Sequence, residues 1–394
     1  MKLSALSTRL GSDAETAWRV HNMAHDRIAR GDDIIMLSIG EEAAETTADV
    51  IVEQAVTSLR AGRHHYSDVR GPARLRQLIA DKHREQCGQQ VSADQCTVYA
   101  GCQNSLFAVA QCILQTSDEV ILPEPYYSTY PGVFTATGAH AVKVQGPADR
   151  LYLCTVDQIA EAINDKTRAI VITQPGNPMG TFYSREELAA LARLCQEKEI
   201  WLISDEVYQS LLAPEERAGP ASHDPDCNYV ITVGSLSKSN RMTGWRVGWT
   251  VTPEPLAKLL AELSMIMHYG LPPFIMDAAV TAIEQDQQTS EQIRQSMNAR
   301  RQLCKSILHT IPNTKLLDSG TGMFLVLDVS ATGINAEDFA IGLLEQHAVA
   351  TLPCASFGDS CENLLRISLC VADEQLRVAF QRIATYTADL SKDS

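Results

Sequence analysis

The sequence predicts an α/β protein with a large, mostly parallel sheet and a second, smaller α+β domain. In the centre of the chain, short β-branched runs alternate with longer amphipathic segments. Strands that alternate with helices usually form a mostly parallel sheet with helices on both faces. After about residue 288 the pattern changes to long, charged helical segments. The 394 residues are enough for about two to three domains of ordinary size.

Six short runs in the central region are expected to be strands. Each is rich in β-branched or other large apolar residues, a composition typical of buried strands. They are "CTVYA" (96–100), "EVILP" (119–123), "AIVIT" (169–173), "IWLISDE" (200–206), "NYVITV" (228–233) and "VGWTV" (247–251). In such sheets, ligands bind beyond the carboxyl ends of the strands.

The clearest helix between these strands is expected at residues 184–198, "SREELAALARLCQEK". Ser184 and Glu187 have the spacing of a capping box, in which each side chain binds a backbone N–H at the start of a helix. Leu188 and Leu191 follow at helical spacing and predict one buried face.

We expect the chain to be organised in three segments. Residues 1–47 form an N-terminal arm that packs with the smaller domain, and residues 48–288 form the large domain. Residues 289–394 form the smaller domain, with long helices in "SEQIRQSMNARRQLCKSIL" and "DEQLRVAFQRIATYTADL". Strands such as "GMFLVLDV" and "LLRISLC" lie between these helices.

Composition and charge exclude several classes of partner. The formal net charge is −15 and no run of basic residues stands out, so neither nucleic acid nor an anionic membrane is an expected partner. The eleven cysteines have neither C-x-x-C pairs nor metal-ligand spacing, which favours free thiols in a reducing compartment and no bound metal. The first residues lack the apolar core of a signal peptide. We therefore expect a cytoplasmic protein.

Polar residues and glycines follow the ends of several predicted strands. Asp205 ends the run "IWLISD", and Tyr208 stands three positions later. Gly101, Cys102 and Gln103 follow "CTVYA" and open a predicted helix. Backbone N–H groups at the start of a helix can bind an anion without any basic side chain. An anionic ligand is therefore expected at this edge of the sheet.

A lysine and an arginine follow the next predicted strands in the same way. Lys238 stands among small hydroxyl residues in "GSLSKSNRMTGWRVGW", and Arg246 comes eight positions later. Asn177 lies between Gly176 and Pro178 in "TQPGNPMG", which predicts a turn. Small neighbours around a single lysine leave room for a ligand to reach its amine.

Together these residues predict a site for pyridoxal 5′-phosphate. Its aldehyde forms a Schiff base with a lysine amine, the role expected for Lys238. Asp205 is expected to pair with the ring nitrogen and keep it protonated. The other expected contacts are Tyr208 and Asn177 at the phenolic oxygen, Ser235, Arg246 and the backbone of Gly101, Cys102 and Gln103 at the phosphate, and Tyr127 on the ring face. Tyr126 is the alternative stacking residue, and Cys102 is expected to contribute its N–H rather than its thiol.

Five motifs, in their order along the chain, resemble those of class I/II aminotransferases of PLP fold type I. They are "EPYYSTYPG", "QPGNPMG", "SDEVY", "SLSKSNRMTGWRVGW" and "LLRISL". The resemblance extends over about residues 18 to 385. It implies a large domain with a seven-stranded sheet, a small domain, and a homodimer with shared active sites.

The resemblance also implies roles for individual residues. By position, Lys238 is similar to the Schiff-base lysine, Asp205 to the partner of the ring nitrogen and Arg246 to a phosphate ligand. Arg366 resembles the arginine that binds the substrate α-carboxylate. Tyr66, in "HHYSDVRG", is similar to the tyrosine that reaches the phosphate of the neighbouring subunit, and Gly40 matches a backbone position that touches the substrate carboxylate.

The expected reaction moves an α-amino group from an amino acid to a 2-oxo acid. Lys238 would carry the proton between the substrate Cα and the cofactor, assisted by Asp205 and Tyr208. A PLP-dependent synthase, lyase, cyclase or oxidase is the alternative, because it would use the same residues. A non-catalytic PLP-sensing module of a transcription regulator is a third reading, for which the sequence leaves little room.

One segment departs from the pattern of the family. The chain has "GEEAAETTADV" where the family usually reads close to "GEPDFDTP", in a loop that closes over substrate. A carboxylate of Glu41, Glu42 or Glu45 would attract a guanidinium and repel an acidic donor. Within the family, "HHYSDVRG", "MTGWRVGW" and "PCASFG" most resemble bacterial arginine–pyruvate transaminases. Arginine or a derivative is therefore the expected donor, unless these glutamates simply face solvent.

Overall fold

A seven-stranded sheet forms the centre of the larger part of the molecule. The computed structural model describes residues 1–10, 18–42, 44–309 and 311–390. The order of the strands is β2-β8-β7-β6-β5-β3-β4. Their bounds are β2 Cys96–Tyr99, β3 Glu119–Glu124, β4 His140–Gln145, β5 Thr167–Thr173, β6 Trp201–Asp205, β7 Val230–Ser235 and β8 Gly248–Val251.

The sheet is mostly parallel, as predicted. Only β8 runs antiparallel to its neighbours β2 and β7 among the pairs that the structure describes. All six expected strands are present, and each end lies within two residues of its predicted position. The seventh, β4, was not predicted, because "HAVKVQ" is an edge strand with mostly polar or half-exposed side chains rather than a buried apolar run.

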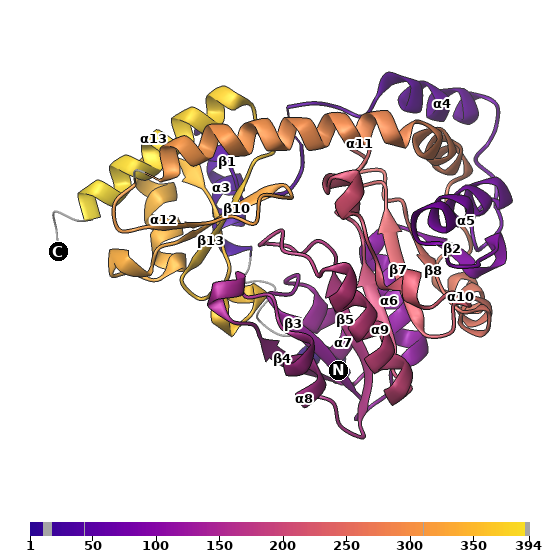
Figure 1. The fold of residues 1–394 in the computed structure, drawn as a ribbon. Helices are drawn as coiled ribbons and strands as arrows, with labels where there is room; N and C mark the ends of the chain where they lie inside the picture. The colour runs from indigo at the N-terminus through magenta and orange to yellow at the C-terminus, as the bar shows by residue number, and fades with distance from the viewer. Residues whose placement is uncertain (11–17, 43, 310, 391–394) are drawn as a thin grey trace.

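Helices cover both faces of this sheet (Figure 1). Residues of α6 and α10 pack against one face, and residues of α8 and α9 pack against the other. The capping box of α9 is confirmed, because Ser184 and Glu187 exchange hydrogen bonds with each other's backbone N–H. The helices are α5 Ala73–Cys87, α6 Cys102–Ile113, α7 Tyr130–Thr135, α8 Val156–Glu161, α9 Arg185–Lys198 and α10 Glu254–Met267.

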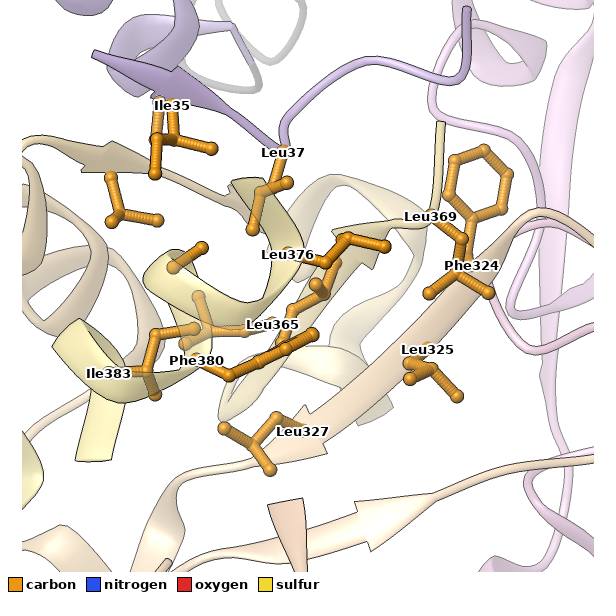
Figure 2. Close-up of a cluster of buried hydrophobic side chains, with 14 of the residues drawn as sticks. Ile35, Leu37, Phe324, Leu325, Leu327, Leu365, Leu369, Leu376, Phe380 and Ile383 are labelled. Carbon is orange, nitrogen blue, oxygen red and sulfur yellow. The ribbon is translucent and has the colours of Figure 1, made fainter. Parts of the chain in front are cut away.

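The smaller part of the molecule is an α+β unit with its own core. An antiparallel sheet has the order β12-β13-β10-β9, and β1 pairs in parallel with β11. Figure 2 shows the side chains between these strands and the C-terminal helix, among them Leu37, Leu327, Leu365 and Phe380. The elements are α3 Arg19–Ile28, β1 Ile35–Met36, β9 Lys315–Leu317, β10 Phe324–Asp328, α12 Ala336–His347, β11 Val349–Ala350, β12 Leu352–Pro353, β13 Leu364–Ser368 and α13 Asp373–Leu390.

One long helix, α11 (Pro273–Leu308), connects the two parts. It runs along the top of the molecule in Figure 1, from α4 (Asp49–Arg60) and α5 to the smaller sheet. Its start lies well before the charged segment from which a helix was predicted, because its first turns are apolar and pack beside α4 rather than in solvent. A short helix, α1 (Leu6–Arg9), lies near the N-terminus. The domain limits at residues 47 and 288 stay predictions.

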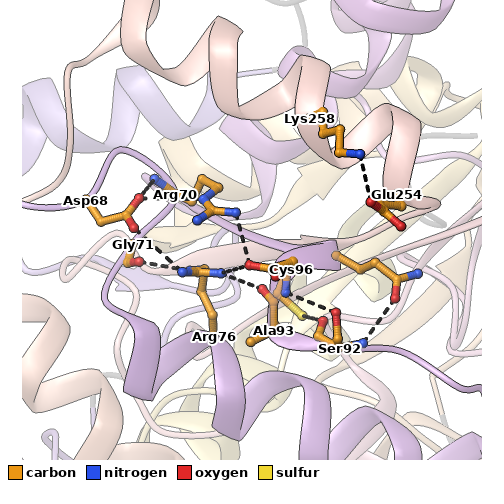
Figure 3. Close-up of polar contacts among 11 residues, drawn as sticks. Asp68, Arg70, Gly71, Arg76, Ser92, Ala93, Cys96, Glu254 and Lys258 are labelled. Carbon is orange, nitrogen blue, oxygen red and sulfur yellow. Dashed lines mark hydrogen bonds and ion pairs between the residues drawn. The ribbon is translucent and has the colours of Figure 1, made fainter.

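A buried arginine fixes the loop that precedes α5 (Figure 3). The guanidinium of Arg76 donates to the carbonyls of Gly71 and Ala93, at 3.0 and 2.7 Å, and pairs with Asp94. Arg70 pairs with the same carboxylate. The segment around residues 68–71, just after Tyr66, is thereby attached to the start of β2.

Within the described residues, no helix is both long enough and apolar enough to cross a membrane.

Candidate active site

The carboxyl ends of the central strands bring most of the predicted residues to one edge of the sheet. Asp205 ends β6 and Ser235 ends β7. Helix α6 begins at Cys102, directly after β2, so the first N–H groups of the helix have no carbonyl partner within it. Lys238 follows three residues after Ser235. The prediction that polar groups converge beyond the strand ends agrees with this placement.

Asp205 is a buried carboxylate with three hydrogen-bond donors from the protein. It accepts from the hydroxyl of Tyr130 at 2.7 Å, from the backbone N–H of Val207 at 3.1 Å and from the thiol of Cys102 at 3.4 Å. Burial raises the pKa of Asp205, and the bonds from Tyr130, Val207 and Cys102 counteract that rise. The carboxylate is thus held at a fixed place.

Two of these donors were not found in the sequence. Cys102 was expected to contribute only its N–H, but its thiol faces Asp205. Tyr130 was not considered, although it lies in the same motif as Tyr127, because nothing in sequence spacing ties it to a residue 75 positions later. The hydroxyl of Tyr130 also bonds Thr173, at 2.8 Å, which fixes its orientation.

The amine of Lys238 points to the segment that precedes the atypical loop. Its Nζ donates to the carbonyl of Gly40 at 2.5 Å. Burial lowers the pKa of Lys238, and Arg366 and Arg246 lower it further, whereas the negative charge of Glu41 acts in the opposite direction. A lowered amine pKa increases the fraction of neutral amine, which is the nucleophilic form.

The start of α6 and the guanidinium of Arg246 form a tight cradle. A Cβ at Gly101 would lie 2.2 Å from Nη2 of Arg246, and a Cβ at Gly248 would lie 2.5 Å from the backbone N of Cys102. Gly101 has a φ of 87°, which also favours glycine. Arg246 donates only to the carbonyls of Thr243 and Ala100 among the described residues, at 2.8 and 3.4 Å. Its positive charge is therefore available to an anion.

A chain of hydrogen bonds joins the large sheet to the smaller domain. Asn177 donates to the hydroxyl of Tyr208 at 3.0 Å and accepts from Nη1 of Arg366 at 3.1 Å. Nη2 of Arg366 donates to the carbonyl of Ser38 at 2.6 Å. The guanidinium stacks over Phe324, 4.2 Å from the ring centroid, and Gly40 lies so close that a Cβ there would clash with this ring.

Arg366 is a buried cation without an acidic partner in the described part of the chain. Only 2% of the residue is exposed, and its Nε has no hydrogen-bond partner. Burial lowers its pKa, which reflects the cost of keeping the charge away from water. A carboxylate ligand would compensate this charge and could occupy the unpartnered Nε.

The remaining predicted residues differ in their placement. Tyr127 packs edge-on against Tyr130, the residue that bonds Asp205, with 6.0 Å between the ring centroids, whereas Tyr126 lies by Lys143. Gln103 accepts from Thr129 at 2.9 Å at the start of α6.

Tyr66 is not part of this group within the single chain. Its side chain is 87% exposed and packs edge-on against Tyr269, with 5.1 Å between the ring centroids.

The glutamates of the atypical loop are in three different environments. The side chain of Glu42 is 2% exposed and pairs with Arg241 at 2.7 Å and with Arg300 at 3.2 Å. Glu45 is 59% exposed and lies 3.7 Å from Arg241. Glu41 is exposed as well and accepts a short hydrogen bond from the hydroxyl of Thr243. Of the three glutamates that were expected to be able to meet a substrate, Glu42 is excluded, because its carboxylate pairs with two arginines.

A cavity of about 590 Å³ opens beside Lys238. Its polar lining includes the three glutamates of the loop and one arginine, together with small residues: Gly40, Glu41, Glu42, Glu45, Arg241 and Thr243. The apolar part of its lining comes from α4, the start of α11 and the smaller domain. These apolar residues are Val52, Val56, Leu59, Phe274, Ile275 and Met323.

The residues at the strand ends fit pyridoxal 5′-phosphate. The cradle at Gly101 and Arg246 offers N–H groups and a positive charge to a phosphate, and any side chain at Gly101 would fill it. The buried carboxylate of Asp205 suits a protonated ring nitrogen. The lowered pKa of Lys238 suits an amine that reacts with an aldehyde.

Comparisons with known proteins agree with this geometry. The model of the family "Aminotransferase class I and II" matches residues 32–383. The chain is 42% identical over 390 residues to an arginine–pyruvate transaminase of Pseudomonas aeruginosa, covering 99% of each protein. It is 31% identical to a probable aspartate/prephenate aminotransferase of Aquifex aeolicus, over 90% of this chain and 91% of that protein.

Solved structures show the same fold. An aspartate aminotransferase of Thermus thermophilus, a single mutant, superimposes with a TM-score of 0.89 at 28% identity, over 98% of this chain and 97% of that one. A Pyrococcus protein reaches the same TM-score at 27% identity. The family and the fold are thereby shown over nearly the whole length. The chain belongs to the class I and II aminotransferases and is a PLP-dependent transferase that moves amino groups from amino acids to 2-oxo acids.

Proposed function

We propose that the amino donor is arginine or a derivative that keeps the cationic end group. The observation that carries this proposal is the 42% identity, over 99% of both chains, to a protein named arginine–pyruvate transaminase. The aspartate aminotransferases of the comparison are more distant, at 27–31% identity. A net charge of −15 also favours a cationic over an anionic substrate.

Arg366 is proposed to bind the α-carboxylate of both donor and acceptor. Its guanidinium is fixed by Asn177, the carbonyl of Ser38 and the ring of Phe324, so it loses little freedom on binding. Its unpartnered Nε supports this role. Gly40 would contribute its backbone beside the same carboxylate.

The cofactor-binding residues are proposed from their placement at the strand ends. The phosphate would be held by the N–H groups of Gly101, Cys102 and Gln103, by Ser235 and by Arg246. Asp205 would bind the ring nitrogen, Tyr208 and Asn177 the phenolic oxygen, and Tyr127 the ring face. When bound, pyridoxal 5′-phosphate supplies an electron sink for the carbanion at the substrate Cα.

Lys238 is proposed to move the proton that leaves the substrate Cα. Its amine is half-buried, at the end of a segment anchored by β7, and its lowered pKa keeps more of the neutral base at a given pH. Three protein donors hold the carboxylate of Asp205 at one position. It could therefore stay paired with the protonated ring nitrogen throughout the reaction. The hydroxyl of Tyr208 is oriented by Asn177.

We further propose that the protein acts as a homodimer with shared sites. Tyr66 is 87% exposed, and Tyr269, Met265 and Ile266 add exposed apolar surface near the end of α10. Apolar side chains in such a group favour contact with another protein surface. Tyr66 would then reach the phosphate of the neighbouring subunit.

A panel of donors tests the proposed substrate. The purified, cofactor-loaded enzyme is mixed in turn with arginine, citrulline, lysine, alanine and aspartate, and the change of the cofactor absorbance is followed in single turnover. The oxo-acid product is identified by mass. Arginine should react fastest; a faster reaction with aspartate would refute the proposed donor and leave a general aminotransferase.

A further inference from the structure

We propose that Glu41 selects the donor by binding the cationic end group of its side chain. The inference rests on the arginine-type donor proposed above and adds the residue that recognises it. The donor class is an amino acid with a long aliphatic stem and a terminal guanidinium.

Glu41 stands directly beside the reacting amine. The residue before it, Gly40, accepts the hydrogen bond of the Lys238 Nζ at 2.5 Å. Its own carboxylate accepts from Thr243, which lies in the segment between Lys238 and Arg246. All three, Gly40, Glu41 and Lys238, line the cavity of about 590 Å³. A donor whose Cα lies beside the Lys238 amine would therefore have this cavity next to its side chain.

Glu41, Glu42 and Glu45 all line the cavity, and Glu41 is the one that forms no ion pair with an arginine of the described residues. Glu42 is excluded because its side chain is only 2% exposed and its charge is compensated by Arg241 at 2.7 Å and Arg300 at 3.2 Å. Glu45 shares Arg241 at 3.7 Å. Within the described residues, Glu41 has no ion pair and bonds only a neutral hydroxyl. Each carboxylate oxygen can accept more than one hydrogen bond, so the bond from Thr243 does not block a guanidinium.

The walls of the cavity match the rest of such a donor. Val52 and Val56 of α4, Phe274 and Ile275 of α11, and Met323 line the same cavity with apolar side chains. Long basic side chains bury their methylene groups on apolar surface and keep the charge at a polar site. Aspartate has no such stem, and its carboxylate would meet the negative charge of Glu41.

Two matched variants test the role of Glu41. Glu41→Gln keeps the shape and the bond to Thr243 but removes the charge, and Glu45→Gln removes a charge from the same loop. The measured quantity is the ratio of kcat/KM for arginine to that for citrulline, a donor of the same shape without the charge. The wild-type enzyme should favour arginine, and Glu41→Gln should lower the ratio about tenfold, as expected for loss of a charge-assisted pair. Glu45→Gln should keep the wild-type ratio.

Binding provides a second readout that does not depend on turnover. The ligand is 5-guanidinopentanoate, which has the carboxylate and guanidinium of arginine but no amine, and its Kd for the holoenzyme is measured by calorimetry. Glu41→Gln should weaken it about tenfold, and Glu45→Gln should not. Equal ratios and equal Kd values in wild type and Glu41→Gln would overturn the inference but not the proposed donor. A wild type that reacts with alanine but with neither arginine nor citrulline would refute the proposed donor itself.

Discussion

Single groups around Asp205 decide whether its carboxylate stays ionised and can pair with a protonated ring nitrogen. Burial alone would favour the neutral acid, which could not stabilise a protonated ring nitrogen. Tyr130, Cys102 and the N–H of Val207 oppose this effect by donating to the charged form. Burial also disfavours the charge of Arg366, and no acidic side chain of the described residues pairs with it. A bound carboxylate would compensate this charge.

Removing the hydroxyl of Tyr130 should change the pH profile of the enzyme. In Tyr130→Phe the pKa of Asp205 should rise, since a bond that lowers it is lost. The acidic limb of kcat/KM should move to higher pH, and the maximum should fall about tenfold, the effect of one hydrogen bond to a charged group. Tyr126→Phe is the control, because Tyr126 lies by Lys143 instead. Identical profiles for wild type and Tyr130→Phe would show that the hydroxyl does not tune Asp205.

Replacing Lys238 should abolish both cofactor attachment and turnover. Lys238→Ala should lose the visible absorbance band that borohydride fixes in the wild type, and kcat should fall by about 10³-fold or more. Lys258→Ala is the matched control, because Lys258 is an exposed residue of α10 paired with Glu254. A fixed band that survives in Lys238→Ala would mean that another amine reacts with the cofactor.

Two loops behave as one element at the edge of the site. Residues 40–42 and 44–47 are attached to the segment 238–246 by the bonds of Lys238 to Gly40 and of Thr47 to the carbonyl of Arg241. Trp245 donates to the same Thr47 hydroxyl at 3.0 Å. Glu42 adds the ion pairs that reach α11 through Arg300. The loop that carries Glu41 is therefore held to both parts of the molecule.

Glu42→Gln should destabilise the fold. The change leaves two largely buried arginines without their shared carboxylate, and breaking a buried pair typically costs about 3 kcal/mol or more. The free energy of unfolding, measured in urea, should fall by about that amount. Glu45→Gln should change it by less than about 1 kcal/mol, because that carboxylate is exposed. A stable Glu42→Gln protein would show that water enters the cluster and solvates the arginines.

A buried histidine of α5 should make stability depend on pH. His83 is 7% exposed and bonds Gln89 at 2.8 Å. Burial lowers its pKa, and the bond to Gln89 only partly opposes this. As the pH falls below about 6.5, the unfolded chain binds a proton that folded His83 does not, so the free energy of unfolding decreases. In His83→Gln this decrease should be smaller, by up to about 1.4 kcal/mol per pH unit. The comparison is made between about pH 5 and 7, which brackets the ordinary pKa of histidine. If the free energies of unfolding of wild type and variant ran parallel over this range, His83 would not be the source of the pH dependence.

At the scale of the whole molecule, the described site lacks one predicted residue. Tyr66 is exposed to solvent and packs beside Tyr269, which is itself exposed. The chain is anchored shortly after it, where Arg76 binds the carbonyls of Gly71 and Ala93. An exposed tyrosine next to an anchored segment is suited to reach into a second copy of the chain.

Mixing two inactive variants should restore part of the activity. A heterodimer of Lys238→Ala and Tyr66→Ala subunits has one site with both an intact Lys238 and an intact Tyr66. After subunit exchange at equal concentrations, about a quarter of the wild-type activity should return. Exchange is verified by native mass spectrometry. No recovery in verified heterodimers would mean that Tyr66 serves its own subunit or has no role in the site.

Local patterns in the sequence predicted the elements that depend on neighbouring residues. The six buried strands and the capping box of Ser184 and Glu187 follow from short-range composition and spacing, and they are confirmed. The polar strand β4 and the early start of α11 were missed, because their place is set by packing against distant segments. The resemblance of five motifs was enough to predict the family and its cofactor.

The sequence alone determined which residues belong near the strand ends, because parallel strands carry their following loops to the same edge of the sheet. Only the tertiary structure decided how these residues share their bonds. Cys102 and Tyr130 both donate to Asp205, although they are far from it in the sequence. Glu42 forms ion pairs with Arg241 and Arg300, whereas Glu41 forms none with the described arginines. Such contacts depend on which distant segments pack together, and local sequence patterns do not predict this. The three glutamates of one loop therefore cannot be told apart in the sequence, although their surroundings in the structure differ.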